Sequence, residues 1–361
     1  MNSNKKTIGI IGAGQLGGML RDAAYKLGFD VVLLPDFKDK NKILQLGKVS
    51  DFVTFEIESA HIEALEALIK EKIPVNPSPK ILKIIKDKFS QKVFLSNKGI
   101  PVAPYAIIEN IEDVKKQGEI FGYPFLLKAR FDAYDGRGNY LVKNKKDIPK
   151  AFEKLGGSQL YAEKFIPFVK ELAVISARDM FDTIESFEVV ETIHKNNICH
   201  IVHSPAVVSP KIKLKARKLT QKVSESLGGV GVFAVEMFLL KNGEIFVNEI
   251  APRVHNSGHH TIEAYSASQF EQHIRAVTGM HLAKPKLMAK SAVMINILGN
   301  REGKANLKGY EKVKLINGIH VHIYGKMETR KERKMGHITA LGNSRRQALK
   351  NALQARKHIS I

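Results

Sequence analysis

The sequence predicts a mixed α/β and α+β protein that begins with a doubly wound parallel sheet. Apolar runs alternate with amphipathic stretches near the N-terminus, as strands and helices do in a parallel sheet. Farther along, short predicted strands are separated by glycine-rich or charged connections. The chain has 361 residues, which at about 150 residues per domain predicts two or three domains.

The alternation of strands and helices is predicted for the N-terminal region. Residues 7–11 form the continuous apolar run that is typical of a buried parallel strand. A proline-containing linker follows this region, and Gly99-Ile100-Pro101 ends its last helix, so we place the first domain at residues 1–98. The predicted elements are strand 7–11, helix 15–27, strands 31–34 and 52–55, helix 62–70 and helix 79–97.

The middle and C-terminal regions have a different pattern. Short strands are predicted at 124–129, 160–164 and 171–177. Two apolar runs within 231–251 flank Asn242-Gly243, a strong hairpin signal. We place the second domain at residues 99–284. Residues 285–361 alternate as small strands do and close with a basic helix at 344–357, which predicts a small C-terminal mixed α/β domain.

The most unusual feature of the composition is its positive charge. The 57 basic and 36 acidic side chains give a net charge of +21, which attracts phosphates of any kind. The lysines are spread along the chain without a basic tail or base-stacking aromatic clusters, which favours a lysine-rich surface over a nucleic-acid partner. An RNA-binding protein remains an alternative, and it predicts affinity that falls steeply with salt.

Cysteine content and hydropathy indicate the compartment. Cys199 is the only cysteine, so intrachain disulfides and multi-cysteine metal sites are excluded. The sequence has no apolar run of the roughly 18 residues that a membrane span needs, and its first residues lack a signal-peptide core. We therefore expect a soluble cytoplasmic protein without a membrane partner.

A glycine motif joins the first predicted strand to the first helix. Gly12-Ala13-Gly14-Gln15-Leu16-Gly17 has the form G-x-G-x-x-G, and Asp36 lies near the end of the second strand, where a ribose-binding acid is expected. The motif is typical of an NAD(P)-dependent oxidoreductase. However, glycines at a helix N-terminus suit any phosphate, or only a tight turn and close packing. These three interpretations stay open at this point.

Two glutamates in the predicted hairpin point to a metal. Folding about Asn242-Gly243 pairs Lys241 with Glu244, and equal steps outward place Glu236 opposite Glu249. Their Cβ atoms would lie about 5 Å apart on one face. Two carboxylates among apolar neighbours repel each other unless a cation lies between them or one is protonated. The pair therefore predicts a divalent cation, Mg²⁺ being usual where phosphates complete its shell.

Upstream residues suit a nucleotide. Residues 134–139 form a loop with two glycines and Arg137, and Lys128 ends the apolar strand before it, so both can place positive charge at a phosphate. Glu163-Lys164-Phe165-Ile166 follows as a short strand and linker, with Glu171 eight residues from Glu163. Such a strand can contact adenine through its backbone while an acid accepts hydrogen bonds from ribose.

This order of motifs resembles the ATP-grasp superfamily, and within it the ATP-dependent carboxylases of purine biosynthesis. The resemblance implies an ATP-grasp domain at 99–284, ATP and Mg²⁺ as ligands, and often a homodimer. It runs along most of the chain and is strongest at residues 12–19, 54–58, 77–79, 134–139, 191–194, 248–259, 324–326 and 333–337.

The resemblance also implies roles for individual residues. It assigns Mg²⁺ to Glu236 and Glu249, in agreement with the hairpin argument, and catalysis to Lys128, Arg253 and His255. The implied ribonucleotide-binding residues are Gln15, Leu16, Tyr134, Asp135, Arg253, His255, Lys326 and Arg333. The implied ATP-binding residues are Lys88, Lys128, Ala133, Tyr134, Asp135, Gly136, Arg137, Gly138, Asn139, Glu163, Lys164, Phe165, Ile166, Glu171, His194, Asn248 and Glu249.

The implied reaction joins bicarbonate to the amine of 5-aminoimidazole ribonucleotide while ATP is cleaved. Another ATP-grasp ligase, such as a formate-using purine transformylase, is the nearest alternative, and the oxidoreductase is a more distant one. His255, His259 and His260 with Glu263 could be drawn as a zinc cluster. The neighbouring Arg253 would repel a cation and suits an anionic substrate, which disfavours zinc.

Overall fold

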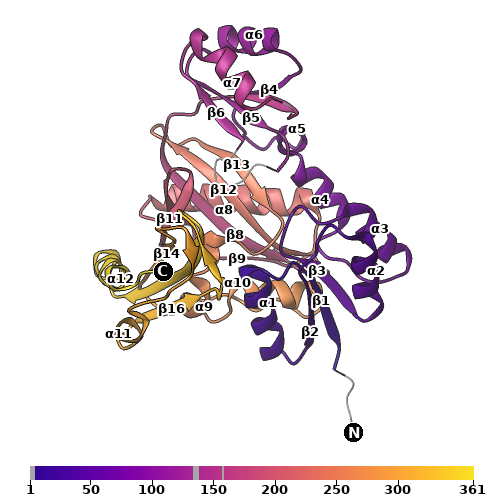
Figure 1. Ribbon diagram of the computed structural model, residues 1–361, viewed down its shortest axis with the longest axis vertical. Helices are drawn as coiled ribbons and strands as arrows, with labels where there is room; N and C mark the ends of the chain where they lie inside the picture. The colour runs from indigo at the N-terminus through magenta and orange to yellow at the C-terminus, as the bar shows by residue number, and fades with distance from the viewer. Residues whose placement is uncertain (1–4, 133–137, 157) are drawn as a thin grey trace.

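The N-terminal region is a parallel sheet covered by helices, as predicted. The structure is a computed structural model that describes residues 5–132, 138–156 and 158–361. The strand order is β2-β1-β3, with both neighbours parallel to the central strand (Figure 1). The elements are β1 (Thr7–Ile11), α1 (Gln15–Lys26), β2 (Asp30–Leu34), α2 (Lys40–Lys48), β3 (Phe52–Phe55) and α3 (Ile62–Lys70).

The predicted single helix at 79–97 is wrong, because the chain breaks it at Asp87. Helix α4 (Pro79–Lys86) ends there and α5 (Lys88–Asn97) begins. Asp87 has extended backbone angles, and its carboxylate accepts hydrogen bonds from Phe89 N at 3.0 Å and from the Arg130 guanidinium. The capped break places Lys88 in the first turn of α5.

A small lobe follows, at the top of the molecule in Figure 1. Its antiparallel sheet has the order β4-β7-β5-β6, and buried apolar side chains of its strands pack against two helices. The elements are β4 (Tyr105–Ile108), α6 (Ile111–Phe121), β5 (Phe125–Ala129), β6 (Asn139–Val142), α7 (Ile148–Lys154) and β7 (Leu160–Lys164).

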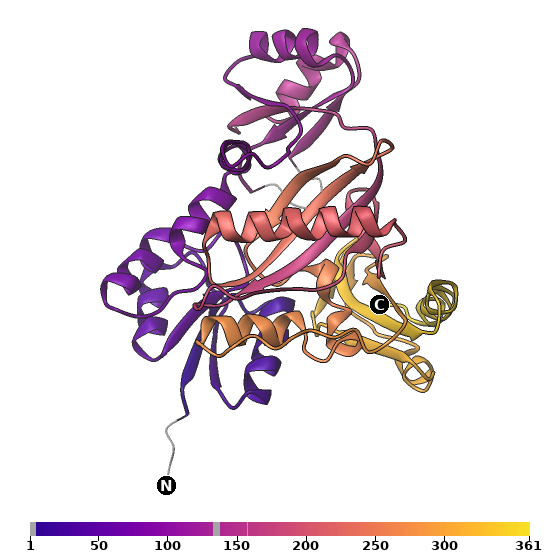
Figure 2. The same cartoon turned by 180° about the vertical axis from the view of Figure 1, so that it is seen from behind.

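A nine-stranded sheet forms the centre of the molecule. Its main path is β13-β12-β8-β10-β11-β14-β18-β16, and β9 (Ile184–Ser186) pairs with β8. Seen from behind in Figure 2, helix α8 (Pro210–Leu227) lies across this sheet. The strands from the middle region are β8 (Phe168–Arg178), β10 (Val190–Lys195), β11 (Ile198–Ser204), β12 (Gly231–Leu240) and β13 (Ile245–Ala251).

The C-terminal region extends the same sheet, because β14 pairs antiparallel with β11. The predicted closing helix is α12 (Arg345–His358), and it packs on β14 and β18. Within the described ranges no helix is long and apolar enough to cross a membrane. The remaining elements are α9 (Thr261–Ala264), α10 (Gln269–Val277), β14 (Ser291–Leu298), β15 (Gly303–Lys304), α11 (Tyr310–Lys314), β16 (Ile319–Ile323), β17 (Glu328–Thr329) and β18 (Lys334–Gly342).

Helix α10 fastens the N-terminal region to the central sheet. Its apolar side packs with α1, β1 and β12 in one buried cluster. Within that contact the His273 ring accepts a hydrogen bond at Nδ1 from Val232 N at 3.1 Å, and its Nε2 lies 2.7 Å from Thr54 Oγ1. Since Nδ1 accepts, Nε2 carries the proton and donates to Thr54. The end of β3 is therefore held in a fixed place relative to β12.

Candidate active site

The predicted pairing of Glu236 with Glu249 is confirmed, although the chain reaches it by another route. The turn is one residue longer than expected: Leu240 N donates to Glu244 O at 2.9 Å, so the predicted pairing of Lys241 with Glu244 is wrong. The register then shifts between Glu236 and Met237, where Asn248 is an extra residue. This bulge offsets the longer turn and restores the pair.

The two carboxylates have opposite electrostatic surroundings. Burial and the nearby charge of Glu249 raise the pKa of Glu236 to about 7. Burial also favours the neutral form of Glu249, but the ammonium of Lys88, which pairs with that carboxylate, outweighs it and lowers the pKa of Glu249. His255 Nε2 lies 3.6 Å from Glu236 Oε1. Negative charge is thus in excess on the Glu236 side of the pair.

This excess fits a divalent cation. Both side chains offer carboxylate oxygens, the donors that Mg²⁺ prefers. A cation between them would relieve the repulsion from Glu249, which adds to burial in raising the pKa of Glu236. In the part of the chain that the structure describes, no group of three or more His, Cys, Asp or Glu side chains could hold a metal. The pair therefore needs further oxygens from a ligand such as a nucleotide phosphate.

Lys128 lies close to these carboxylates, and its environment includes a residue that sequence analysis missed. Its Nζ is 3.2 Å from Glu163 Oε1, and Lys92 Nζ is 2.7 Å from Glu163 Oε2. The Lys128 ammonium also lies over the Tyr161 ring, 5.6 Å from its centroid. Glu163 is 1% exposed, and its two carboxylate oxygens face Lys92 and Lys128.

Glu171 and His194 lie together on the face of the central sheet that carries the carboxylate pair. Glu171 Oε2 is 3.1 Å from His194 Nδ1, and burial, which disfavours the imidazolium, is outweighed by this carboxylate, so the pKa of His194 is raised. The predicted linker follows β7, with Phe168 N donating to Ile166 O at 2.8 Å. The resemblance implies that Glu171 and His194 both contact ATP, and the pairing of β8 with β10 brings their side chains together.

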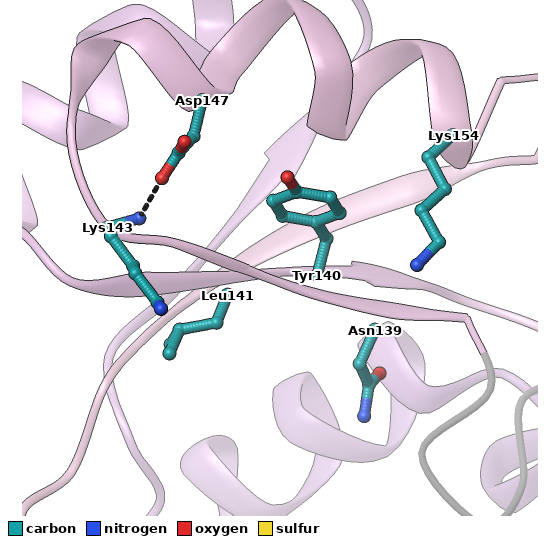
Figure 3. Close-up of a pocket in the computed structure, with 6 residues that line it drawn as sticks. All are labelled: Asn139, Tyr140, Leu141, Lys143, Asp147 and Lys154. Carbon is teal, nitrogen blue, oxygen red and sulfur yellow. Dashed lines mark hydrogen bonds between the residues drawn. The ribbon is translucent and has the colours of Figure 1, made fainter.

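A hollow of about 330 Å³ lies on the small lobe. Figure 3 shows six residues that line it. Asn139, a predicted ATP-binding residue, lines it together with Tyr140, Leu141, Lys143, Asp147 and Lys154. The other described residues of the predicted ATP site do not line this hollow, so we do not assign it to ATP. Predicted residues Ala133, Tyr134, Asp135, Gly136 and Arg137 lie outside the described residues.

The glycine motif has a different purpose from the one its pattern suggests. The backbone amides of Gly14 and Gly17 both donate to the carboxylate of Glu56, at the end of β3. A Cβ added at Gly12 would lie 2.2 Å from Glu56 Cγ. The glycines thus make room for Glu56, which fills the anion-binding position at the start of α1. Because Glu56 occupies this position, the dinucleotide interpretation loses its phosphate site. Asp36, the candidate ribose-binding acid of that interpretation, pairs with Lys42 at 2.9 Å.

Residues predicted to hold the ribonucleotide come together from distant segments. Lys326 Nζ donates to Gln15 Oε1 at 3.0 Å, which joins the C-terminal region to the start of α1. Burial, with Arg333 and Lys334 nearby, lowers the pKa of Lys326 to about 8. Leu16 is half-buried and packs into the cluster between α1 and α10. This group of cations is suited to an anion such as a phosphate.

Arg253 and His255 occupy the segment after β13. Arg253 Nη2 lies 2.8 Å from Glu58 Oε1, a partner that sequence analysis missed although 54–58 was among the informative stretches. His255 Nδ1 accepts from Ser257 N at 3.3 Å, so its proton lies on Nε2, directed toward Glu236. Burial and the positive charge of Arg253 lower the pKa of His255, which is therefore neutral.

Two of the three histidines of the suggested zinc cluster, His255 and His259, have separate partners. His255 faces Ser257 and Glu236, while His259 Nδ1 lies 3.3 Å from Gln269 Nε2. The Glu263 carboxylate pairs with His322 of β16. The cluster drawn from sequence spacing does not converge on one point.

The small lobe and the central sheet, with lysines and paired carboxylates between them, define an ATP-grasp enzyme, an ATP-dependent ligase. The ATP-grasp domain family matches residues 93–270. The phosphoribosylaminoimidazole carboxylase C-terminal domain family matches residues 292–351. More particularly, the chain belongs to the N5-carboxyaminoimidazole ribonucleotide synthase family. The synthase of that name from Staphylococcus aureus strain COL is 36% identical over 95% of this chain and 96% of its own length.

Other relatives support the same family. The crystal structure of N5-carboxyaminoimidazole ribonucleotide synthetase from Thermotoga maritima is 41% identical, with a TM-score of 0.88 over 98% of this chain and 99% of its own. The Aspergillus clavatus synthase in complex with ADP and 5-aminoimidazole ribonucleotide is 35% identical, with a TM-score of 0.90 and the same coverage. Phosphoribosylaminoimidazole carboxylase of Ogataea methanolica is 41% identical over 94% of this chain, which spans about two thirds (67%) of that relative. The predicted fold and family are confirmed.

Proposed function

We propose that this protein catalyses the ATP-dependent carboxylation of 5-aminoimidazole ribonucleotide by bicarbonate. The products are 5-(carboxyamino)imidazole ribonucleotide, ADP and phosphate, in the synthesis of purines. The observation that carries the proposal is the paired Glu236 and Glu249 on a sheet that also carries Glu171 and His194, with Lys88 bound to one member of the pair. The Aspergillus clavatus relative in complex with ADP and the same ribonucleotide supports the choice of substrates.

The ATP side of the reaction depends on charge at the phosphates. Glu236 and Glu249 would hold Mg²⁺, which supplies neutralisation of charge on the transferring phosphoryl group. Lys88 and Lys128 contribute positive charge from α5 and β5, and Asn248, at the bulge, precedes Glu249. Glu171 and His194 lie on the same face of the sheet, where the ribose and the polyphosphate of a bound nucleotide would lie.

The first chemical step activates bicarbonate. A bicarbonate oxygen attacks the γ-phosphorus, and the bond from that phosphorus to the β–γ bridging oxygen breaks, releasing ADP and forming carboxyphosphate. Arg253 holds the carboxyphosphate by its guanidinium, exchanging the contact with Glu58 for the new anion. The neutral His255 donates its Nε2 proton as a hydrogen bond to an oxygen of this intermediate.

The second step transfers the carboxyl group. The exocyclic amine attacks the carbonyl carbon of carboxyphosphate, the carbon–oxygen bond to phosphate breaks, and the leaving phosphate takes the amine proton. Gln15, Lys326 and Arg333 hold the ribonucleotide through its phosphate, so the amine is positioned beside Arg253 and His255. Tyr134 and Asp135 are further proposed contacts with the ribonucleotide.

We also propose a cytoplasmic homodimer. A single cysteine and the absence of disulfides suit a reducing compartment. Sedimentation of the purified protein measures the assembly directly.

Phosphate release tests the function. Purified protein with Mg²⁺ and ATP should release phosphate at the full rate only when bicarbonate and 5-aminoimidazole ribonucleotide are both present, because a closed site protects carboxyphosphate from water. Formate should not replace bicarbonate. Full turnover without the ribonucleotide, or turnover supported by formate alone, would assign the protein to another ATP-grasp reaction.

A further inference from the structure

A buried group of two lysines and one glutamate lies beside the proposed phosphate site. Lys92 comes from α5, Lys128 from β5 and Glu163 from β7, so three separate segments contribute. One carboxylate oxygen of Glu163 is 2.7 Å from Lys92 Nζ, and the other is 3.2 Å from Lys128 Nζ. Exposure is 2% for Lys92, 8% for Lys128 and 1% for Glu163. We call these three residues the Lys92–Glu163–Lys128 triad.

As a purely structural feature the triad would be energetically unfavourable. Burying ammonium groups is unfavourable, and two like charges on one carboxylate repel each other. Burial lowers the pKa of Lys92, while Lys128 and Lys92 overcome the effect of burial on Glu163 and lower its pKa to about 2. Two ammonium groups share one carboxylate, so the triad has one positive charge in excess. Hydrophobic packing alone would not require a second lysine here.

We infer that Lys92 is a positioning residue for the phosphate site, which occupies one oxygen of Glu163 so that Lys128 keeps its positive charge available to the phosphates of ATP. This inference rests on the proposed function, because it takes Lys128 as a phosphate ligand. Without Lys92, Glu163 would neutralise Lys128 completely and draw its ammonium toward the β7 side. Lys92 itself is too buried to touch the nucleotide and acts through Glu163.

The chain contains a matched triad for comparison. Glu191 of β10 has one carboxylate oxygen 2.7 Å from Lys170 Nζ and the other 3.0 Å from Arg345 Nη1. Side chains alternate along a strand, and Glu191 pairs with Leu172, so this second triad lies on the face of the sheet opposite Glu171 and His194. It shares the charge pattern but does not face the proposed site.

Binding of ADP and of adenosine by the full-length protein separates a phosphate effect from a structural one. Lys92→Met should weaken Mg²⁺-ADP binding by roughly 10- to 100-fold, the scale of one hydrogen bond to a charged group. Its affinity for adenosine, measured by ligand-observed NMR, should stay within about twofold of the wild type, because adenosine has no phosphates. Lys170→Met should leave the affinity for ADP unchanged.

A double variant tests the inference even if Lys92→Met does not fold. Lys92→Met with Glu163→Gln removes one positive and one negative charge, so the triad again carries a single net positive charge, which lies on Lys128. ADP affinity should recover to within a few-fold of the wild type, a rescue that a packing role does not predict.

Three results would overturn the inference: unchanged ADP binding in Lys92→Met, an equal loss of adenosine binding, or a double variant no better than the single one. Wild-type protein that binds neither ADP nor adenosine would instead contradict the proposed function.

Discussion

The glycine loop and the β12–β13 hairpin each bring a carboxylate to a place that looks like a ligand site, but only one is electrostatically satisfied. At the loop, Glu56 accepts hydrogen bonds from two backbone amides, and the anion position is filled by the protein itself. At the hairpin, Glu236 faces Glu249, and burial together with the charge of Glu249 raises the pKa of Glu236 to about 7. The difference teaches that unbalanced charge, more than a sequence pattern, indicates a ligand site.

Neutralising the hairpin pair should have the largest effect. Glu249→Gln or Glu236→Gln removes one of the two proposed Mg²⁺ ligands while relieving repulsion, so the protein should fold but lose ATP cleavage by about 10³-fold or more. Phosphate release at saturating Mg²⁺ measures the loss, with thermal unfolding as the check on folding. Near-normal turnover in both variants would remove the metal site from this pair.

The cationic group beside the loop should give the next largest effect. Lys326→Ala or Arg333→Ala removes a proposed ligand of the ribonucleotide phosphate, so KM for the ribonucleotide should rise by roughly 10- to 100-fold. KM for ATP should change little. Steady-state kinetics with each substrate varied in turn gives both constants, and a rise confined to ATP would place these residues at the nucleotide.

Much of this comparison could be predicted from the sequence. Apolar periodicity gave the N-terminal strands within about one residue, because buried parallel strands have few alternatives. The Glu236–Glu249 pairing was predicted for an incomplete reason, since turn length and the bulge at Asn248 each depend on backbone geometry that residue types do not specify. The longer turn shifts the register by one residue and the bulge at Asn248 shifts it back, so Glu236 still pairs with Glu249.

Contacts between distant segments could not be predicted. Nothing local to Gly12-Ala13-Gly14 indicates that Glu56 fills the loop, because the contact depends on β3 lying beside β1. Lys92 looked like one of many surface lysines, and only the fold buries it against Glu163. The break at Asp87 was missed because its cap includes Arg130, more than 40 residues away.

Replacing Glu56 tests the hydrogen bonds that its carboxylate accepts from the glycine loop. Glu56→Gln keeps one acceptor oxygen but places an NH₂ donor against a backbone amide, so the free energy of unfolding should fall by about 1–3 kcal/mol. The start of α1 carries Gln15, the partner of Lys326, so KM for the ribonucleotide should rise several-fold while KM for ATP stays constant. Denaturant titration and kinetics measure the two effects. No loss of stability would mean that the amide contacts of Glu56 contribute nothing.

A pH-dependent effect is expected at His273, whose Nε2 lies 2.7 Å from Thr54 Oγ1 of β3. Burial lowers the pKa of His273 to about 4, so the folded protein keeps the ring neutral while the unfolded chain takes up a proton near pH 6.5. Its contribution to stability is complete above about pH 6.5 and is lost as the pH falls toward 4, at most about 3 kcal/mol over that window.

His273→Gln removes this proton uptake while keeping a side chain that can hydrogen-bond. The free energy of unfolding of the variant, measured by denaturant titration between about pH 7 and 4.5, should therefore decrease less steeply with acid than that of the wild type, by up to one proton in slope. Other buried histidines such as His203 and His260 keep both curves falling, so the difference between the curves is the informative quantity. Parallel curves would mean that His273 is protonated alike in the folded and unfolded protein, and its Nδ1 would then carry a proton and could not accept the hydrogen bond from Val232 N in acid.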